Sequence, residues 1–307
     1  MKRILITGAH GFLGKHVVKA FGNTHTLLTP TRHRLNLLDT QELMYYMNDY
    51  RPEIVIHLAA QCGGIGINRD KPGEFLYNNL MMTTNLIESC RWNCCVEKFV
   101  GVGTVCSYPK FTPVPFKEED LYNGYPEETN APYGLAKRMQ LEMLRAYRTQ
   151  YGLNGICLIP TNMIGEHDNF KDESSHVVPA LLKKFHSAKL HNHPSVTLWG
   201  DGSATREFLY AGDCAEAIVK ATELYNEPDP VNIGTGVEIT IKDLAEKVRQ
   251  VVGFNGNIIW DTSKPNGQPR RCLDVSRAKE AFGFEAKANF NQVLHNMYSW
   301  AQENNVL

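Results

Sequence analysis

The segment Thr7–Gly14, TGAHGFLG, follows directly on the apolar run Arg3–Thr7. Its glycines Gly8, Gly11 and Gly14 stand where a strand would turn tightly into a helix, so that backbone N–H groups and the helix dipole could meet a pyrophosphate. A glycine-rich turn without a ligand is the alternative interpretation. The place of the turn on the first predicted strand favours a dinucleotide site, and with it an α/β fold built on a doubly wound parallel sheet.

The first half of the chain alternates strand-like apolar runs with amphipathic stretches, which is the βαβ rhythm of a parallel sheet. After residue 160 this rhythm breaks into a polar segment and shorter elements. We therefore expect a nucleotide-binding domain of residues 1–165 plus about 205–235, and a second, smaller substrate-binding domain of about 166–204 plus 236–307. Beyond the first turn, strands are expected at 25–28, 54–59, 98–102, 155–160, 196–199 and 231–233, and helices near 40–48, 78–92, 133–151, 177–189 and 241–252.

The composition excludes several kinds of partner. The 307 residues include 32 Lys and Arg against 33 Asp and Glu, a net charge of −1, so no global field would attract nucleic acid or an anionic membrane. No apolar stretch approaches the roughly 20 residues that span a bilayer, and the opening MKRILITG runs into the glycine turn instead of a signal-peptide pattern. We expect a cytoplasmic protein. The eight cysteines lack CxxC pairs, so neither a metal site nor a disulfide is expected.

The end of the second predicted strand bears on which dinucleotide binds. NAD sites commonly place Asp or Glu there for the ribose hydroxyls, whereas this chain reads Leu28-Thr-Pro-Thr-Arg-His-Arg34. Hydroxyl and guanidinium groups suit a 2′-phosphate, which favours NADP. The alternative is that Arg32 and Arg34 are only solvated loop charges.

Tyr133 and Lys137 are four residues apart, so on a helix they point the same way. We expect the ammonium to lower the pKa of the phenol, which could then exchange a proton with a sugar oxygen. An ordinary surface pair would be the default for such spacing alone. Thr104 also follows a predicted strand, in position to hydrogen-bond the same oxygen. Together the three residues predict a site for proton transfer to a carbonyl or alcohol.

These residues, the glycine motif and His57-Leu-Ala-Ala60 resemble the extended short-chain dehydrogenases/reductases that modify nucleotide sugars. The resemblance covers nearly the whole chain and implies a Rossmann domain with a second, smaller domain for the substrate. Longer blocks are similar, more narrowly, to the GDP-L-fucose synthases: Cys62–Asn68, Cys106–Pro109, Pro160–Asn162, His167–Phe170, Ser175–Leu182 and Arg206–Phe208.

The narrower resemblance implies a reaction in which GDP-4-keto-6-deoxy-mannose is epimerised at carbons 3 and 5 and reduced at carbon 4 by NADPH. Three alternatives stay open: a sibling that epimerises one carbon only, as a colitose synthase does, a reductase of a related GDP-keto-sugar without epimerisation, and a non-catalytic NADP-binding regulatory module. Thr104 and Val105 stand where that family usually has serines, and a threonine hydroxyl can still donate a hydrogen bond.

The same resemblance implies that Cys106 and His176 are the acid and base of the epimerisation. The 4-keto group acidifies the hydrogens on both neighbouring carbons, and a thiol can act as the base if a nearby cation favours its thiolate. Taken alone, Cys106 would equally be a small buried residue at a strand end. His176 alone would more simply cap the helix expected from Val177.

The resemblance also implies the ligand contacts and a homodimer built through 78–92 and 133–151. The substrate is expected to contact Asn162, Val177, Leu181, Lys184, Trp199, Arg206 and Arg271, with Lys184, Arg206 and Arg271 at the pyrophosphate. Lysine at 184 is a departure, since the family often has arginine there. The NADP contacts are expected from Gly8, His10, Gly11, Phe12, Leu13, Gly14, Arg32, Asn36, Leu37, Leu58, Ala59, Ala60, Lys137, Pro160, Asn162, Met163 and His176.

Overall fold

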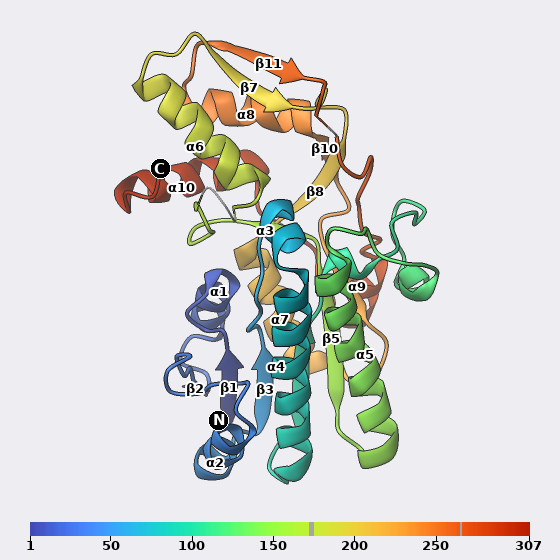
Figure 1. The fold of residues 1–307 in the computed structure, drawn as a ribbon. Helices are drawn as coiled ribbons and strands as arrows, with labels where there is room; N and C mark the ends of the chain where they lie inside the picture. Colours follow the sequence, from blue (N-terminus) through green and yellow to red (C-terminus); the bar gives the residue numbers. More distant parts are fainter. Residues whose placement is uncertain (172–174, 265) are drawn as a thin grey trace.

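Six parallel strands form the larger sheet of the computed structural model, which describes residues 1–171, 175–264 and 266–307. Their order is β2-β1-β3-β4-β5-β9, and their arrows in Figure 1 point toward the smaller lobe. The order reverses beside β1, because β2 lies on one side of β1 and β3, β4 and β5 lie on the other, so the sheet has its topological switch point between β1 and β3. The strands are β1 (Arg3–Thr7), β2 (Thr26–Leu28), β3 (Ile54–His57), β4 (Lys98–Val102), β5 (Gly155–Pro160) and β9 (Val231–Ile233).

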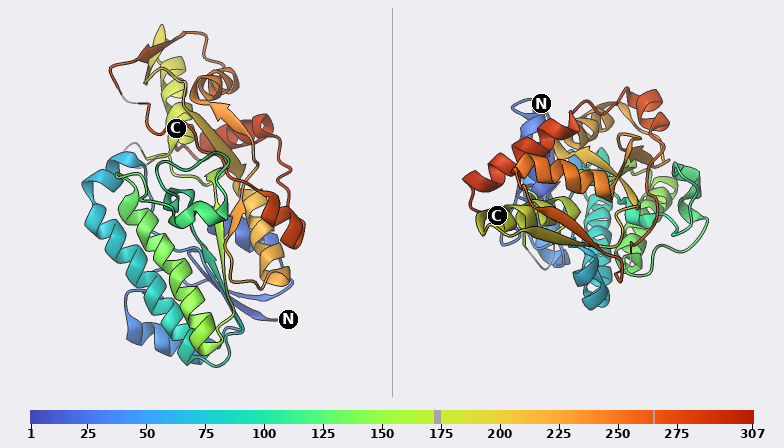
Figure 2. Two further views of the ribbon diagram at one scale, coloured as in Figure 1. Left: turned by 90° about the vertical axis from the view of Figure 1, so that its right-hand side faces the viewer. Right: turned by 90° about the horizontal axis from the view of Figure 1, so that it is seen from above.

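Helices cover both faces of this sheet, so the predicted doubly wound α/β fold is confirmed. On one face α1 (Phe12–Phe21), α7 (Ala211–Leu224) and α9 (Ser276–Phe282) share a core with β1, β3, β4 and β5. On the other face lie α2 (Thr40–Tyr50), α4 (Pro72–Trp92) and α5 (Ala131–Tyr151), of which α4 and α5 pack side by side (Figure 2). Near-continuous burial of the strands follows from this double cover.

The smaller lobe is assembled from later segments around its own apolar core. Strand β7 (Ser195–Trp199) pairs in parallel with β11 (Asn257–Asp261), and β8 (Thr205–Tyr210) pairs with both β6 (Asn162–Ile164) and β10 (Glu238–Thr240). Helices α6 (Val177–Leu190), α8 (Ile241–Val252) and α10 (Phe290–Glu303) pack on these strands. The remaining elements are α3 (Ile65–Asp70) and the 3-10 helices η1 (Val105–Ser107) and η2 (Glu118–Tyr122).

A buried carboxylate joins the segments that meet between the lobes. Glu207 on β8 has no exposed surface. Its Oε1 accepts the N–H groups of Thr235 (2.5 Å) and Gly236 (2.8 Å), just after β9, and its Oε2 accepts the N–H of Leu273 (2.8 Å), before α9. Two chain segments are therefore held to one side chain of β8.

Several element boundaries differ from those expected, most of them by one or two residues. The helix expected at 78–92 begins at Pro72, whose ring suits the first turn of a helix. The strand expected at 54–59 ends at His57, whose buried ring bonds Thr7 Oγ1 (2.8 Å) and Thr83 Oγ1 (3.0 Å). All eight cysteines are free thiols. Among the helices of the described residues, none has the length and apolar character to cross a bilayer.

Lys98 at the start of β4 generates a test of stability. Its ammonium is buried and donates to three carbonyls at the end of α7, those of Ala221 (3.0 Å), Thr222 (2.6 Å) and Tyr225 (2.5 Å). Lys98→Met removes these charge-assisted bonds and leaves the helix end unsatisfied. We expect the free energy of unfolding to fall by about 2–4 kcal/mol, measured by chemical denaturation.

The control is Lys220→Met, at a lysine of α7, the helix whose end accepts the bonds of Lys98. Lys220 donates a single surface bond, 2.8 Å long, to the carbonyl of Gly283. Its loss should cost less than about 1 kcal/mol. Equal denaturation midpoints for Lys98→Met and the unmodified chain would show that the buried ammonium does not anchor α7.

Candidate active site

The glycine turn packs too closely for side chains at the start of α1. A Cβ at Gly14 would lie 2.2 Å from the carbonyl oxygen of Gly8. The Gly11 N–H bonds that same oxygen at 3.0 Å, which closes the turn. Leu58, Ala59 and Ala60 follow the neighbouring strand β3 and lie at the same edge of the sheet. The turn, the N-terminus of α1 and this loop make a backbone-lined cradle that suits a pyrophosphate.

The loop after β2 lies beside this cradle. His10 Nε2 is 2.9 Å from the carbonyl of Thr29, which ties the glycine turn to the loop. Arg32 is exposed, and within the described ranges it forms no ion pair. The Asn36 N–H bonds Glu42 Oε1 at 3.1 Å, and Leu37 is buried in the core. Arg32 is therefore available to an incoming anion, whereas Leu37 serves packing.

Tyr133, Lys137 and Thr104 come together at the carboxyl end of β4. The Thr104 side chain lies close enough to the Tyr133 phenol to lower its pKa slightly, and Lys137 Nζ donates to the carbonyl of Val102 at 2.9 Å. The expected lowering of the phenol pKa is wrong for this structure, because burial raises the pKa of Tyr133 well above its ordinary value. Burial also lowers the pKa of Lys137. The tyrosine therefore keeps its proton until an acceptor reaches it.

Cys62 is a contact of Tyr133 that the sequence reasoning missed. Its Sγ lies 3.4 Å from the phenol oxygen, on an exposed loop between β3 and α3. Desolvation of the sulfur raises the pKa of this thiol, so it stays protonated and can donate to the phenol oxygen. The available signal was its position two residues after Ala60, at the same sheet edge.

Cys106 lies in η1, immediately beside this group. The N–H of Cys106 donates to Thr104 Oγ1 at 3.2 Å. Helix α5 approaches closely because residue 134 is glycine, where a Cβ would lie 2.4 Å from the Cys106 carbonyl. Arg271 Nη1 donates to Cys106 Sγ at 3.6 Å, from the smaller lobe. A guanidinium donor is the kind of partner that a basic sulfur requires.

Arg206 and Arg271 concentrate positive charge near Cys106. Burial, and then repulsion from Arg271, lowers the pKa of Arg206 to about 10. Arg271 donates to Gln268 Oε1 at 3.2 and 2.7 Å, while the carboxylate of Glu238 pairs with Arg270. Across the described part of the chain, neither arginine forms an ion pair with a carboxylate. An anion such as a diphosphate would relieve this repulsion.

His176 comes from the smaller lobe, at the N-cap of α6. Its side chain is 53% exposed, and its Nδ1 lies 3.9 Å from Oδ1 of the buried Asp168. No hydrogen bond joins His176 to Cys106 among the described residues. Cys106 follows β4 of the larger sheet, whereas His176 begins α6 of the smaller lobe.

The remaining expected contacts differ in how free they are to meet a ligand. Trp199 is 69% exposed, with the ammonium of Lys264 5.9 Å from its ring centre. Lys184 Nζ donates to the carbonyl of Thr197 at 3.1 Å. Asn162 Nδ2 donates to the Glu207 carbonyl at 3.0 Å. Several expected contacts pack in the cores: the buried ones are Leu13, Leu37 and Leu181, and the partly buried ones are Phe12, Leu58, Ala59, Met163 and Val177.

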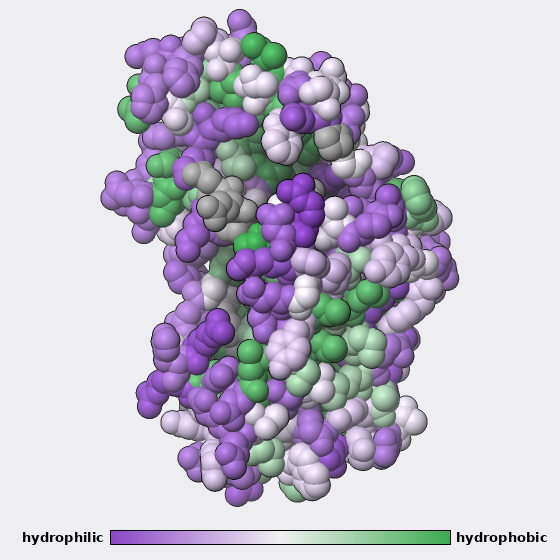
Figure 3. All heavy atoms as spheres, in the orientation of Figure 1, coloured by the Kyte–Doolittle hydropathy of each residue, from purple (hydrophilic) through white to green (hydrophobic). Residues whose placement is uncertain are grey.

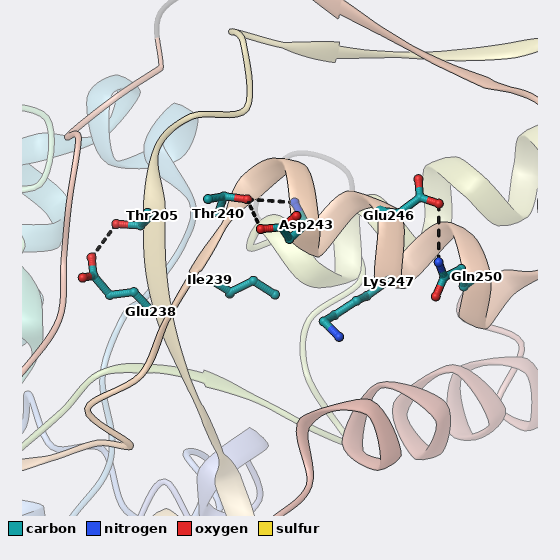
Figure 4. Close-up of a pocket in the computed structure, with 8 residues that line it drawn as sticks. All are labelled: Thr205, Glu238, Ile239, Thr240, Asp243, Glu246, Lys247 and Gln250. Carbon is teal, nitrogen blue, oxygen red and sulfur yellow. Dashed lines mark hydrogen bonds between the residues drawn. The ribbon is translucent and has the colours of Figure 1, made fainter.

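An open pocket of about 500 Å³ lies elsewhere, between β10 and the start of α8 (Figure 4). Its carboxylates come from Glu238, Asp243 and Glu246. This acidic lining does not suit a diphosphate, and none of the expected site residues lines it. Its lining residues are Thr205, Glu238, Ile239, Thr240, Asp243, Glu246, Lys247 and Gln250.

Comparison with known proteins places this geometry in a family. The model of the NAD dependent epimerase/dehydratase family matches residues 4–234. The chain belongs to this family. It is 41% identical to the GDP-L-fucose synthase of Sinorhizobium fredii over 277 residues, 90% of this chain and 88% of that protein. It is 32% identical to the GDP-L-colitose synthase of Yersinia pseudotuberculosis over 290 residues, 94% of each.

A solved structure is similar over the whole fold. The crystal structure of a GDP-L-fucose synthetase from Naegleria fowleri bound to NADP superposes with a TM-score of 0.91 at 27% identity, covering 99% of this chain and 95% of that one. The resemblance inferred from the motifs is thus confirmed in both sequence and fold, and it extends beyond the residues that the family model matches.

The tight glycine turn generates a binding test. In Gly14→Ala the added Cβ must displace the Gly8 carbonyl, which moves the N–H groups that would meet the pyrophosphate. We expect NADPH to bind at least about tenfold more weakly, by titration of NADPH fluorescence. The control is Gly73→Ala, because a Cβ at Gly73 meets nothing within 4 Å. Unchanged affinity in a folded Gly14→Ala protein would place the cofactor elsewhere.

Proposed function

We propose that this protein is an NADPH-dependent enzyme that epimerises GDP-4-keto-6-deoxy-mannose at carbons 3 and 5 and reduces it at carbon 4 to GDP-L-fucose. One observation carries the proposal: Cys106, with the guanidinium of Arg271 at its sulfur, is bonded through its N–H to Thr104, whose side chain lies close to the Tyr133 phenol. A reductase of the carbonyl needs only the tyrosine group. A base beside it accounts for the additional epimerisation.

The cofactor proposal rests on the cradle. Backbone of the glycine turn and of residues 58–60 would hold the pyrophosphate, since no room exists there for side chains. Arg32 would meet the 2′-phosphate, as it is exposed and the loop carries no carboxylate before Asp39. When bound, NADPH supplies a hydride to carbon 4. NADP in the similar Naegleria fowleri structure supports this choice.

Reduction then requires a proton at the carbon 4 oxygen, which Tyr133 supplies. Burial keeps its phenol protonated, so the proton is present when charge develops on the sugar oxygen. The phenolate left behind is stabilised by donors already in place, the Thr104 hydroxyl and the Cys62 thiol. The ammonium of Lys137, one helical turn away, adds a positive charge.

Epimerisation uses the same ketone as an electron sink. Cys106 takes the proton from a carbon next to the ketone, and the electron pair moves to the carbon 4 oxygen, where Tyr133 and Thr104 stabilise it as an enolate. His176 then gives a proton to that carbon from the opposite face, which inverts the centre. One set of oxygen-binding donors thus serves both chemistries.

The GDP end of the substrate is assigned to the smaller lobe. Arg206 and Arg271 would hold the diphosphate, which offsets the repulsion between the two cations. Lys184 would add a point charge, and the exposed ring of Trp199 would stack on guanine, with Asn162, Val177 and Leu181 placing the lobe around it.

The alternatives are a colitose-type enzyme that inverts one centre, a reductase that inverts none, and a non-catalytic NADP-binding module. The similarity to the GDP-L-colitose synthase supports the first alternative, because a relative with that name is similar over nearly the whole chain. The position of Cys106 beside Thr104, together with His176 at the start of α6, favours the full reaction. Product analysis separates all four possibilities.

We also propose a homodimer, a cytoplasmic place of action and the division into domains expected above. Figure 3 shows apolar side chains gathered over α4 and α5, the helices expected to form the dimer contact. Large apolar residues are exposed on them: Leu76, Tyr77, Trp92, Met139 and Tyr151. Burying this face in a second copy would remove it from water.

The decisive experiment separates exchange from reduction. With GDP-4-keto-6-deoxy-mannose in deuterated water and no NADPH, the unmodified enzyme should place deuterium at carbons 3 and 5, seen by NMR. With NADPH the product should be GDP-L-fucose. Cys106→Ser, a much weaker base of similar size, should lose most of the exchange and still bind NADPH. Exchange at the normal rate in Cys106→Ser would make Cys106 a packing residue only.

Tyr133→Phe tests the reductase group separately. It removes the proton donor and leaves the ring packing, so NADPH oxidation should fall by roughly 10²-fold or more. Some deuterium exchange should persist, because Cys106 is intact. Near-normal NADPH oxidation by the folded variant would contradict the role of Tyr133, and NADPH oxidation without exchange in the unmodified enzyme would favour the reductase that inverts no centre.

A further inference from the structure

Asp168 is a buried carboxyl group that the proposed reaction has not used. It follows β6, and its side chain is only 2% exposed. Its Oδ1 accepts the N–H of Asn169 at 2.7 Å, whereas its Oδ2 is buried without a hydrogen-bond partner in the described chain. Removing a carboxylate from water is costly unless a cation or donors compensate it. A carboxylate retained in this state therefore points to a partner close by.

His176 is the group that this carboxylate faces. Its Nδ1 lies 3.9 Å from Asp168 Oδ1, while the side chain of His176 is 53% exposed. Nδ1 therefore lies near the carboxylate, while about half of the His176 side chain is open to solvent or a ligand. Other charged or titratable groups around this loop have partners elsewhere: Lys15 contacts His167, His16 contacts the Glu166 carbonyl, Tyr210 contacts Glu166, and Lys183 contacts the Phe170 carbonyl.

Helix α6 makes such a partner necessary. His176 is its N-cap, at the positive end of a helix of 14 residues. The helix dipole opposes a positive charge at that end, so it works against a protonated imidazole. A proton donor at this position needs a compensating negative charge. Among the described residues, Asp168 places a carboxylate within 4 Å of the ring.

We propose that Asp168 is the positioning residue of His176: it accepts the Nδ1 proton, orients the ring with Nε2 toward the substrate, and holds the charged ring against the dipole of α6. A small rotation of either side chain closes the 3.9 Å separation to a hydrogen bond. The inference rests on the proposed function, in which His176 is the acid. In that step Nε2 loses its proton to the substrate carbon, Nδ1 keeps the proton shared with Asp168, and solvent later reprotonates Nε2.

The test uses Asp168→Asn, which keeps the size and removes the charge. In deuterated water, exchange through Cys106 should persist while inversion falls by roughly 10- to 100-fold. Affinity for NADPH should not change. The rate of inversion should also need a more acidic solution, by about one pH unit or more, and should be partly rescued there. A purely structural role for Asp168 would lower all rates together without moving the pH profile.

Asp213→Asn is the matched control. Asp213 is likewise buried, and its Oδ2 accepts the N–H groups of Lys287 and Ala288 at 2.9 Å each, on α7 away from His176. This variant should leave the ratio of inversion to exchange, and its pH profile, unchanged.

Two further measurements separate the possible failures. If His176→Asn still inverts both centres, the acid role in the proposed function is wrong. If His176→Asn loses inversion but Asp168→Asn keeps it with the normal pH profile, only the inference about Asp168 is overturned. If Asp168→Asn does not fold, nitrogen NMR of the unmodified protein tests the inference. The signals of the His176 ring are assigned by their loss in His176→Asn. The neutral ring should carry its proton on Nδ1. A proton on Nε2 would overturn the inference.

Discussion

The carboxylate of Glu207 is the interaction on which the arrangement of the site depends. Burial raises the pKa of Glu207, and the backbone donors of Thr235, Gly236 and Leu273 oppose that rise. A buried carboxylate with several N–H partners is stabilised by them and in turn restrains the segments that supply them. The segment that reaches Leu273 also carries Arg271, and Glu207 follows Arg206 directly. The positions of both guanidinium groups therefore depend on the buried side chain of Glu207.

A second constraint is the shared oxygen-binding group. The side chains of Thr104 and Cys62 lie close to the Tyr133 phenol near the end of β4. Cys106 lies in the short 3-10 helix η1, which begins directly after Thr104. Proton removal beside a ketone and hydride addition to it both place negative charge on the ketone oxygen. A single set of donors can therefore stabilise both, while the proposed acid–base pair Cys106 and His176 would serve epimerisation alone.

The parts of this structure that could be predicted from the sequence are those whose cause is local. The glycine turn, the strands at 155–160 and 231–233, and the spacing of Tyr133 and Lys137 depend on neighbours within a few residues. Asp168, Glu207 and Lys98 could not be recognised in this way, because their partners lie 8 to 127 residues away along the chain. The direction of the Tyr133 pKa was predicted wrongly for the same reason: the enclosure that desolvates the phenol comes from several distant segments.

The discontinuous smaller lobe has a consequence for how the protein is made. When residue 233 has left the ribosome, all six strands of the larger sheet have been synthesised, and that sheet can form. Strand β7 then still lacks its partner β11, and the buried face of α6 lacks α8 and α10. The nascent chain therefore exposes an unpaired strand edge and an apolar helix face for as long as the last quarter takes to be synthesised. Such surfaces are the ones that chaperones bind and that aggregation exploits.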